Sequence, residues 1–563
     1  MVTVTVTTTV TTTVTTTVTT TTTTTMTTMP ILRRALAALV LPVLATAQVP
    51  ARGPAFMQWA AWSDAKPALD SLYTADAPPL WLQECAPTPQ ATALVAWLAN
   101  ADSLGLDARD YDARAIGERL ARLARDGCAA GEAYVTDTDR ALSAAAVRAV
   151  RALWLGRANV REAHADLRFP RQVVDRASYV RGLAASGSVA ADMAALEPPF
   201  EPYQWLLTAL QRYRRLAADT SLAIGPRPAT LPVRPGDPFP QAERLRRKLV
   251  AVHDLPEGTT GDATYDSALV DGVKRFQRRT GRTADGVIGP RTWDALAEPP
   301  TSRLRQITLA LERFRWLPRT FAREPILVNL PEFKLYAFRE MTRDTVVADT
   351  MNVVIGRAFK SETPVFTGEL GYLVFSPYWE VPPGIGSREI RPKALRGGAA
   401  YLARNDYILA STATGATVPS TRANIERIGR GVRVRQKPGP GNSLGGVKFM
   451  FPNEFNVYLH DTPSKRLFED AQRDYSHGCV RVADPPALAR FVLRDEPGDW
   501  TDARIRAAMS TGTERRVNLR QKHPVFIIYA TAVPRRDGVV RFLDDVYGLD
   551  KELAALLAKA PAR

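Results

Sequence analysis

The sequence is poor in residues that carry catalytic or metal chemistry. Its 563 residues include three cysteines and five histidines. No region gathers enough of them for zinc, because His253 lacks the several further ligands that a zinc site requires. The sequence therefore indicates neither a metal site nor a cofactor.

Long apolar runs are also missing. Residues 35–44 are apolar but too few to favour a membrane span, and no other segment approaches that length. This run follows the basic pair Arg33 and Arg34 and precedes the small residues 45–47, the pattern of a secretory signal peptide. We therefore expect residues 29–47 to direct export, and the mature chain to be periplasmic.

The first 28 residues are almost entirely threonine and valine. Such a tract has strand propensity but no pattern that defines a core, so we predict no fold for it. Because signal peptides begin at the N-terminus, we expect translation to start at Met26 or Met29. The tract would then lie upstream of the translated protein.

The chain carries a net charge of +16, from 74 Lys and Arg against 58 Asp and Glu. A basic balance favours either nucleic acid or acidic surfaces such as cell-wall polymers and anionic lipid. Many arginines recur at helical spacing, which is typical of a solvated helix face, and no nucleic-acid motif accompanies them. We therefore expect no nucleic-acid partner.

The three cysteines fall in two places. Cys85 and Cys128 lie in the N-terminal half, whereas Cys479 is far downstream. In an oxidising compartment the first two can pair and leave one free thiol; the alternative is two buried, unpaired cysteines.

Periodicity divides the chain into regions. Residues 48–235 are mostly helical and end in a Pro-rich linker at 225–240, and residues 236–299 contain three short helices around Val273, Phe276 and Leu296. Residues 300–550 begin with a helix and continue with repeated short strands, which predicts a mixed-strand β domain. Residues 384–440 form a basic, Gly-rich insertion in it, and 551–563 are a C-terminal tail.

One stretch combines the residues of nucleophilic catalysis. His460 ends an apolar, strand-like run, and Cys479 follows a turn at Gly478. A thiol needs a base to become a nucleophile, and the oxyanion that it creates needs donors, which the N–H groups of Gly478 and Cys479 can supply. Spacing alone leaves open the alternative that Cys479 is a buried cysteine beside histidines with a structural role.

The pattern around Cys479 resembles a known family. His460, fifteen intervening residues, and then Ser476, His477, Gly478 and Cys479, with Arg481 two places on, are similar to the active-site signature of the L,D-transpeptidases, the YkuD-type catalytic domain. Asp461 stands where smaller members carry Gly, as in the large periplasmic branch. Phe276-Gln277 and Asp285-Gly-Val-Ile-Gly289 likewise resemble a peptidoglycan-binding domain.

The resemblance implies a multidomain α+β fold. It would comprise a helical scaffold, a three-helix peptidoglycan-binding domain, and a mixed-strand β catalytic domain whose inserted capping subdomain acts as a mobile lid. Cys479 would attack a tetrapeptide stem, release D-Ala, and pass the acyl group to a diaminopimelate amine as a 3→3 cross-link, with His460 as base. Ser476, His477 and Gly478 would shape the oxyanion loop, and Arg481, Tyr378 and Trp379 would contact substrate.

The implied partners are peptidoglycan stem peptides and also glycan strands, with carbapenem-type inhibitors expected to modify Cys479. Two alternative functions remain open. A cell-wall cysteine peptidase, either an L,D-carboxypeptidase or an endopeptidase, would use the same nucleophile, although in such endopeptidases the cysteine usually precedes the histidine. A non-catalytic wall-binding protein would need only the module at 236–299.

Overall fold

The computed structural model describes residues 64–74, 77–164, 167, 173–321, 323–342 and 345–559, together with the backbone of two short strands near the N-terminus. These strands, β1 (Thr7–Val10) and β2 (Val18–Thr21), pair antiparallel. They belong to a unit, Met1–Ala51, that is separate from the rest of the chain. The predicted signal peptide and start sites lie outside the described residues.

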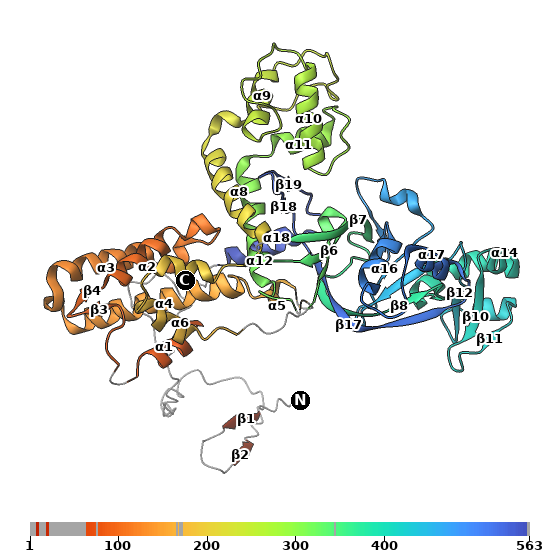
Figure 1. Ribbon diagram of the computed structural model, residues 1–563, viewed down its shortest axis with the longest axis horizontal. Helices are drawn as coiled ribbons and strands as arrows, with labels where there is room; N and C mark the ends of the chain where they lie inside the picture. Colours follow the sequence, from red (N-terminus) through yellow and green to blue (C-terminus); the bar gives the residue numbers. More distant parts are fainter. Residues whose placement is uncertain are drawn as a thin grey trace, which may run out of the picture. The chain divides into compact units, whose positions relative to one another are not determined.

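The first folded region is helical (Figure 1). Its main helices are α1 (Lys66–Leu72), α2 (Pro89–Ala99), α3 (Ala113–Asp126), α4 (Glu132–Leu155), α5 (Val160–Ala163), α6 (Arg176–Ala184), α7 (Val189–Ala195) and α8 (Glu201–Ala218). Helix α4 is the centre of the region, because its alanines are buried and let α1, α3 and α6 pack closely against it. Cys85 and Cys128 form a disulfide, which decides between the two alternatives that the sequence left open.

The next module consists of α9 (Ala242–Ala251), α10 (Ser267–Arg279) and α11 (Pro290–Ala297) around a small apolar core. Phe276 lies in that core, and the neighbouring Gln277 is buried as well. The Gln277 amide donates to Asp285 at 2.8 Å, and its oxygen accepts from the Gly286 N–H at 2.8 Å. Gln277 therefore fixes the turn that the sequence pattern predicts.

The region after residue 300 contains a nine-stranded mixed sheet in the order β15-β7-β16-β14-β13-β8-β17-β5-β6. Its strands are β5 (Ile326–Asn329), β6 (Lys334–Glu340), β7 (Val346–Gly356), β8 (Phe366–Phe375), β13 (Val447–Met450), β14 (Leu459–His460), β15 (Asp474–Ser476), β16 (Val480–Val482) and β17 (Arg515–Ile528). β6 also pairs with β7, so the sheet closes on itself. The closed sheet surrounds a core of Val, Leu, Ile and Phe side chains.

Helices and a hairpin flank this sheet. They are α12 (Pro300–Trp316), α16 (Pro485–Leu493), α17 (Asp502–Ser510), α18 (Leu549–Ala558), and the hairpin of β18 (Ala532–Pro534) and β19 (Val540–Phe542). Among the described residues, no helix combines the length and apolarity that a membrane crossing needs.

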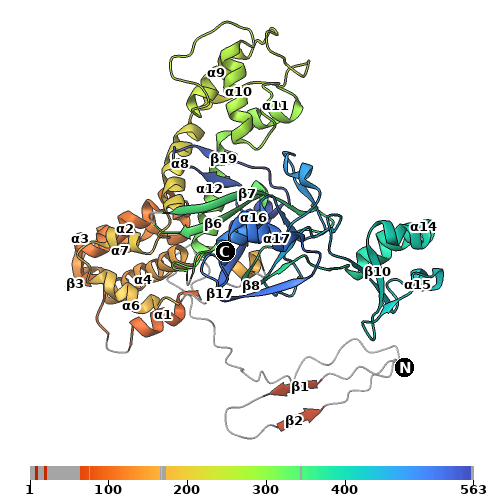
Figure 2. The ribbon, with the colours of Figure 1, turned by 45° about the vertical axis from the view of Figure 1, so that its right-hand side comes forward.

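An insertion between β8 and β13 forms a second, four-stranded sheet in the order β11-β10-β12-β9. Its elements are β9 (Trp379–Glu380), α13 (Pro383–Ile385), α14 (Arg391–Arg404), β10 (Tyr407–Ser411), β11 (Thr417–Val418), α15 (Arg422–Glu426) and β12 (Val432–Gln436). α14 and α15 lie beside β10 in Figure 2, and the insertion has its own apolar core. This insertion, the helical scaffold, the three-helix module and the mixed sheet confirm the predicted multidomain α+β fold.

Candidate active site

Pairing of β14 with β16 brings the two predicted catalytic residues onto neighbouring strands. The strands run parallel, with Leu459 opposite Val480 and His460 opposite Arg481. Leu459 and Val480 point into the core of the closed sheet. Because side chains alternate between faces, His460 and Arg481 point to the opposite face, and Tyr458 and Cys479 share that face one step back.

His460 is buried, and its environment fixes its chemistry. Its Nδ1 hydrogen-bonds the main-chain carbonyl of Asp461. Since a carbonyl can only accept, Nδ1 carries the proton and Nε2 is left with a free lone pair. Burial, reinforced by the charge of Arg481, lowers the pKa of His460 to about 3, so the ring is neutral at pH 7.

Among the described residues, the side chain of Asp461 makes no hydrogen bond with His460; it hydrogen-bonds the surrounding loops. It accepts from the Gly446 and Thr462 N–H groups at 2.8 and 2.7 Å and pairs with Lys465 at 2.6 Å. The acceptor that orients His460 is therefore the main-chain carbonyl of Asp461 and not its carboxylate.

Cys479 is the one free cysteine and is half-buried. Its thiol lies 3.6 Å from the main-chain carbonyl of Asn456. Burial raises the pKa of the thiol, while hydrogen bonding with Tyr458 and the charge of Arg481 oppose that rise. Within the described part of the chain no hydrogen bond joins Cys479 to His460, although the two side chains share a face.

A network of hydrogen bonds shapes the loop before Cys479. The Ser476 hydroxyl donates to the Cys479 carbonyl at 2.6 Å and accepts from the Gly478 N–H at 3.1 Å. Thr363 donates to the Gly478 carbonyl at 2.8 Å. Gly478 has φ +113°, which disfavours any side chain there.

The structure departs from one expectation for this loop. The Gly478 N–H, predicted as an oxyanion donor, points to the Ser476 hydroxyl instead of the cleft. The Cys479 N–H has no hydrogen-bond acceptor among the residues that the structure describes. The Ser476 side chain thus stabilises the loop by hydrogen bonds inside it. Of the two predicted oxyanion donors, only the Cys479 N–H is free to bind an oxyanion.

The remaining predicted residues lie around this centre. His477 reaches out to Glu389 of the insertion at 2.7 Å. Trp379 hydrogen-bonds Tyr458, which connects the small sheet to the thiol. Tyr378 is held differently: its N–H donates to Glu514 at 2.8 Å, and Arg435 lies 4.5 Å above its ring.

Arg481 is half-buried and has no carboxylate partner in the described ranges of the chain. Its buried Nε also has no hydrogen-bond partner there. Burial lowers the pKa of the guanidinium, although it remains positive at pH 7. A buried charge without a counter-charge is costly, which favours a site for an anionic substrate group over a structural ion pair.

Several neighbours of the thiol were not predicted as site residues. Tyr458 is two residues before His460, and this alternation is the one sequence signal that places both on a single strand face. Three more residues reach this region only through the tertiary fold, so no local sequence pattern identifies them. The Asn456 carbonyl contacts the thiol, Thr363 contacts the Gly478 carbonyl, and Glu389 contacts His477.

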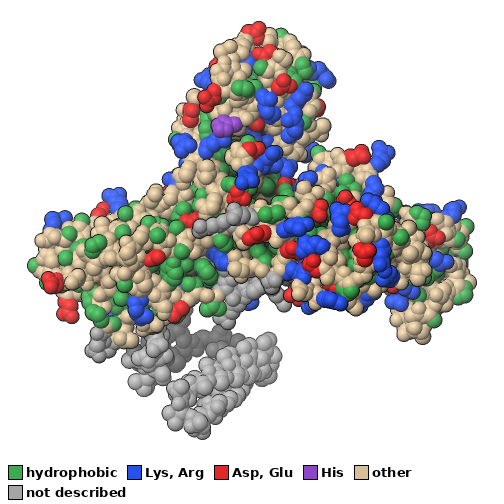
Figure 3. All heavy atoms as spheres, viewed as in Figure 1, with side chains coloured by type: hydrophobic (Ala, Val, Ile, Leu, Met, Phe, Trp, Pro, Cys, Tyr) green, Lys and Arg blue, Asp and Glu red, His purple; other side chains and the backbone are tan. Residues whose placement is uncertain are grey.

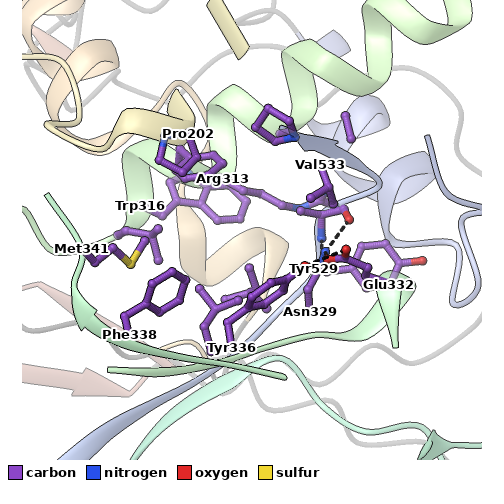
Figure 4. Close-up of a pocket in the computed structure, with 18 of the residues that line it drawn as sticks. Pro202, Arg313, Trp316, Asn329, Glu332, Tyr336, Phe338, Met341, Tyr529 and Val533 are labelled. Carbon is purple, nitrogen blue, oxygen red and sulfur yellow. Dashed lines mark hydrogen bonds between the residues drawn. The ribbon is translucent and has the colours of Figure 1, made fainter. Parts of the chain in front are cut away.

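A separate apolar cavity of about 210 Å³ lies between α12 and strands β5 and β6 (Figure 4). Trp316, Phe338 and Met341 line it, and Arg313 and Glu332 stand at its edge. None of the residues around Cys479 lines this cavity, so it is distinct from the candidate active site.

Three stretches of the chain match known protein families. Residues 323–525 match the L,D-transpeptidase catalytic domain of the YkuD family, residues 67–210 the scaffold domain, and residues 240–296 the "Putative peptidoglycan binding domain". A "Putative L,D-transpeptidase" of Haemophilus influenzae is 30% identical over 259 residues, which are 45% of this chain and 50% of that protein. The chain thus spans about half the length of this curated relative.

Two solved structures also resemble parts of the chain. An L,D-transpeptidase from Xylanimonas cellulosilytica has 16% identity and a TM-score of 0.15, covering 54% of this chain and 100% of its own. A fused Zn-dependent amidase/peptidase with a peptidoglycan-binding domain from Clostridium acetobutylicum has 13% identity and a TM-score of 0.16, covering 52% and 97%.

Proposed function

Since residues 323–525 belong to the YkuD family of L,D-transpeptidase catalytic domains, we propose that this protein is a cysteine-dependent peptidoglycan L,D-transpeptidase that forms 3→3 cross-links. One observation carries the proposal. The parallel pairing of β14 and β16 places His460, Arg481, Tyr458 and Cys479 on one face of the sheet.

In the first half-reaction, Nε2 of His460 takes the thiol proton as sulfur attacks the carbonyl of the third residue of a tetrapeptide stem. The bond to the terminal D-Ala breaks, and its amine leaves with the proton returned by His460. Nδ1, held on the Asp461 carbonyl, fixes the ring for both transfers. The resting site lacks the thiol–imidazole hydrogen bond, so we expect that contact to form when substrate binds.

In the second half-reaction, the side-chain amine of a neighbouring diaminopimelate attacks the thioester, and sulfur leaves to regain its proton. The Cys479 N–H is the free donor for the oxyanion of both steps. The unpaired guanidinium of Arg481 is suited to a substrate carboxylate beside the reacting carbonyl. The predicted signal peptide supports action in the periplasm, where these stems lie.

The test is incubation of the protein with disaccharide-tetrapeptide. We expect a 3→3 dimer with loss of D-Ala, no product from Cys479→Ala, and a carbapenem adduct of Cys479 in the intact mass. Cleavage without dimers would indicate the cysteine peptidase instead. No reaction by a folded wild-type protein would leave only a wall-binding role.

A further inference from the structure

A basic cleft separates the three-helix module from the catalytic sheet. It has a volume of about 820 Å³, which is within the range of ligand-binding clefts. The α10–α11 segment lines one side, and the other side comes from residues near β6, β15 and β19. Contacts hold the two sides together: Arg282 pairs with Asp544 at 3.0 Å, and Gly281 lies against Leu543.

Arginines outnumber carboxylates in this cleft. Its lining includes Arg278, Arg282, Arg291, Arg473 and Arg541. The acidic residues of the lining are Asp285, Glu332 and Asp544. Figure 3 shows several Lys and Arg side chains together on the visible face of the module.

Two of these arginines form no salt bridge with the residues that the structure describes. Arg473 is buried and donates to the main-chain carbonyls of Val353, Asp470 and Phe333, but to no carboxylate. Arg278 is exposed and has no ion-pair partner among the described residues. By contrast, Arg541 pairs with Glu332, and Asp544 serves both Arg282 and Arg291. The cleft therefore retains positive charge for a ligand.

An exposed aromatic side chain stands at the edge of the cleft. Phe359 is 80% exposed, the highest value for a large apolar side chain in the described residues. Its φ is +58°, a conformation that costs free energy for a residue other than glycine. A non-glycine residue held at positive φ is found more often at functional sites, which supports a contact role for this ring.

The loop that carries Phe359 also supports the catalytic loop. Ala358 and Phe359 line the cleft, while Ser361 donates to the Ser476 carbonyl at 3.0 Å and Thr363 to the Gly478 carbonyl at 2.8 Å. Cleft and nucleophile are thus connected by residues 357–363.

We propose that this cleft binds the carboxylate-bearing peptide stems of a peptidoglycan strand and guides that strand toward Cys479. Guanidinium groups bind carboxylates with two parallel hydrogen bonds, and the Phe359 ring offers an apolar face to the strand. The inference rests on the proposed function, because it names where the polymer lies while one of its stems reacts.

The test measures binding of labelled glycan strands that carry tetrapeptide stems to the full chain with Cys479→Ala, so that no turnover occurs. We expect the double substitution Arg278→Glu/Arg291→Glu to weaken binding about tenfold. Phe359→Asn, which tolerates positive φ, should also weaken it. The matched control is Arg244→Glu, the same charge reversal at an exposed position of α9 outside the cleft, which should leave binding unchanged.

A second arm uses the same strands after removal of their peptides. We expect weak binding with little dependence on salt, whereas binding of stem-bearing strands should fall steeply with salt. Equal binding by the double variant and its parent would overturn the proposal. Equal binding of strands with and without their peptide stems would overturn it as well. If the double variant misfolds, the salt dependence of strand binding by the parent protein tests the proposal by itself. The transfer assay with soluble disaccharide-tetrapeptide is separate, so its failure would refute the function and leave the cleft testable.

Discussion

Burial sets the protonation of the thiol and the imidazole more than any contact between them does. It raises the pKa of Cys479 and lowers that of His460 to about 3. Both groups are therefore neutral at pH 7, and in the proposed mechanism the thiolate forms as His460 accepts the proton during attack.

The alkylation of Cys479 by iodoacetamide should show this directly. Because the pKa of the thiol is raised, we expect the rate to climb from about pH 6 to about pH 9 without a plateau. His460 should add no inflection between about pH 5 and about pH 8. Intact mass against time gives the rate, and a plateau below about pH 8 would contradict the neutral pair.

Tyr458 should make the thiol more reactive. Hydrogen bonding with Tyr458 lowers the pKa of Cys479, so Tyr458→Phe should slow alkylation at pH 8 by about twofold to tenfold. Tyr372→Phe is the matched control, because Tyr372 lies on β8 with Arg516 above its ring. Equal alkylation rates for the two variants would show that the Tyr458 hydroxyl does not affect the thiol.

Arg481 should act on substrate binding. Since it has no carboxylate partner in the described residues, Arg481→Gln should raise KM for the tetrapeptide donor by about tenfold or more, with a smaller effect on kcat. Arg481→Lys should recover part of the loss. A fall in thermal stability with unchanged KM would instead indicate a structural role.

The two reacting side chains of the site are predictable from sequence, but their partners are not. The spacing of His460 and Cys479, together with the family resemblance, is enough to indicate base and nucleophile. Arg481 was already expected from the same motif, whereas Tyr458 joins them only through the register of β14 and β16. The direction of the Gly478 N–H depends on the Ser476 rotamer, which no sequence pattern reports.

At the scale of elements, the loop 357–363 holds the nucleophile in place through Thr363. Its hydroxyl donates to the Gly478 carbonyl and accepts from the Gly356 N–H, both at 2.8 Å. Thr363→Val keeps the shape but leaves two buried main-chain groups unpaired. We expect a loss of about 1–3 kcal/mol in unfolding free energy and a slower transfer reaction.

Denaturant unfolding and the transfer assay measure both effects of Thr363→Val. Thr417→Val, on the half-exposed strand β11, is the matched control and should change neither quantity. If Thr363→Val has the unfolding free energy and the transfer rate of the wild-type protein, other contacts hold the loop.

The disulfide stabilises the helical region without reaching the active site. Cys85 and Cys128 are 43 residues apart, so their bond restricts a long loop of the unfolded chain. Replacing both by serine should cost about 2–4 kcal/mol in the unfolding of this region. Transfer activity at 25 °C should persist, and its loss in a folded variant would mean that the scaffold acts on catalysis.

Most elements follow from periodicity, and the exception is instructive. The apolar run at 525–528 forms the end of β17, which begins ten residues earlier at Arg515. That earlier part is rich in Arg, Asn, Gln and Lys, so it has no apolar alternation to detect. It becomes a strand because β8 pairs with most of it.

At the scale of the whole molecule, buried histidines link folding to pH. Burial lowers the pKa of His164 to about 4 and of His460 to about 3, and it also lowers that of His523. The unfolded chain therefore binds more protons below its histidine pKa of about 6.5. This contribution to stability is complete above about pH 6.5 and declines as the pH falls toward the folded values.

We expect the melting temperature to drop below about pH 6, and to drop less in His164→Gln than in the parent. Calorimetry across pH measures the difference between the two proteins. Parallel curves for parent and variant would show that His164 does not take up a proton on unfolding.

The order of the regions along the chain is predictable from composition, but the contacts between the regions are not. Arg279 illustrates this, because a solvated face was expected for the α10 arginines. Arg278 is exposed, whereas Arg279 is buried, pairs with Asp254 at 2.6 Å and lies near Phe542 of β19. One residue on the helix faces solvent and the next anchors the module.

Trp379 belongs to the small inserted sheet, yet its indole hydrogen-bonds the tyrosine beside the nucleophile. His477 likewise joins the nucleophile loop to Glu389 of the insertion. A shift of the insertion as a unit would break both links at once and change the acidity of the sulfur. Displacement of the insertion would therefore affect the thiol through Tyr458 and the loop before it through His477.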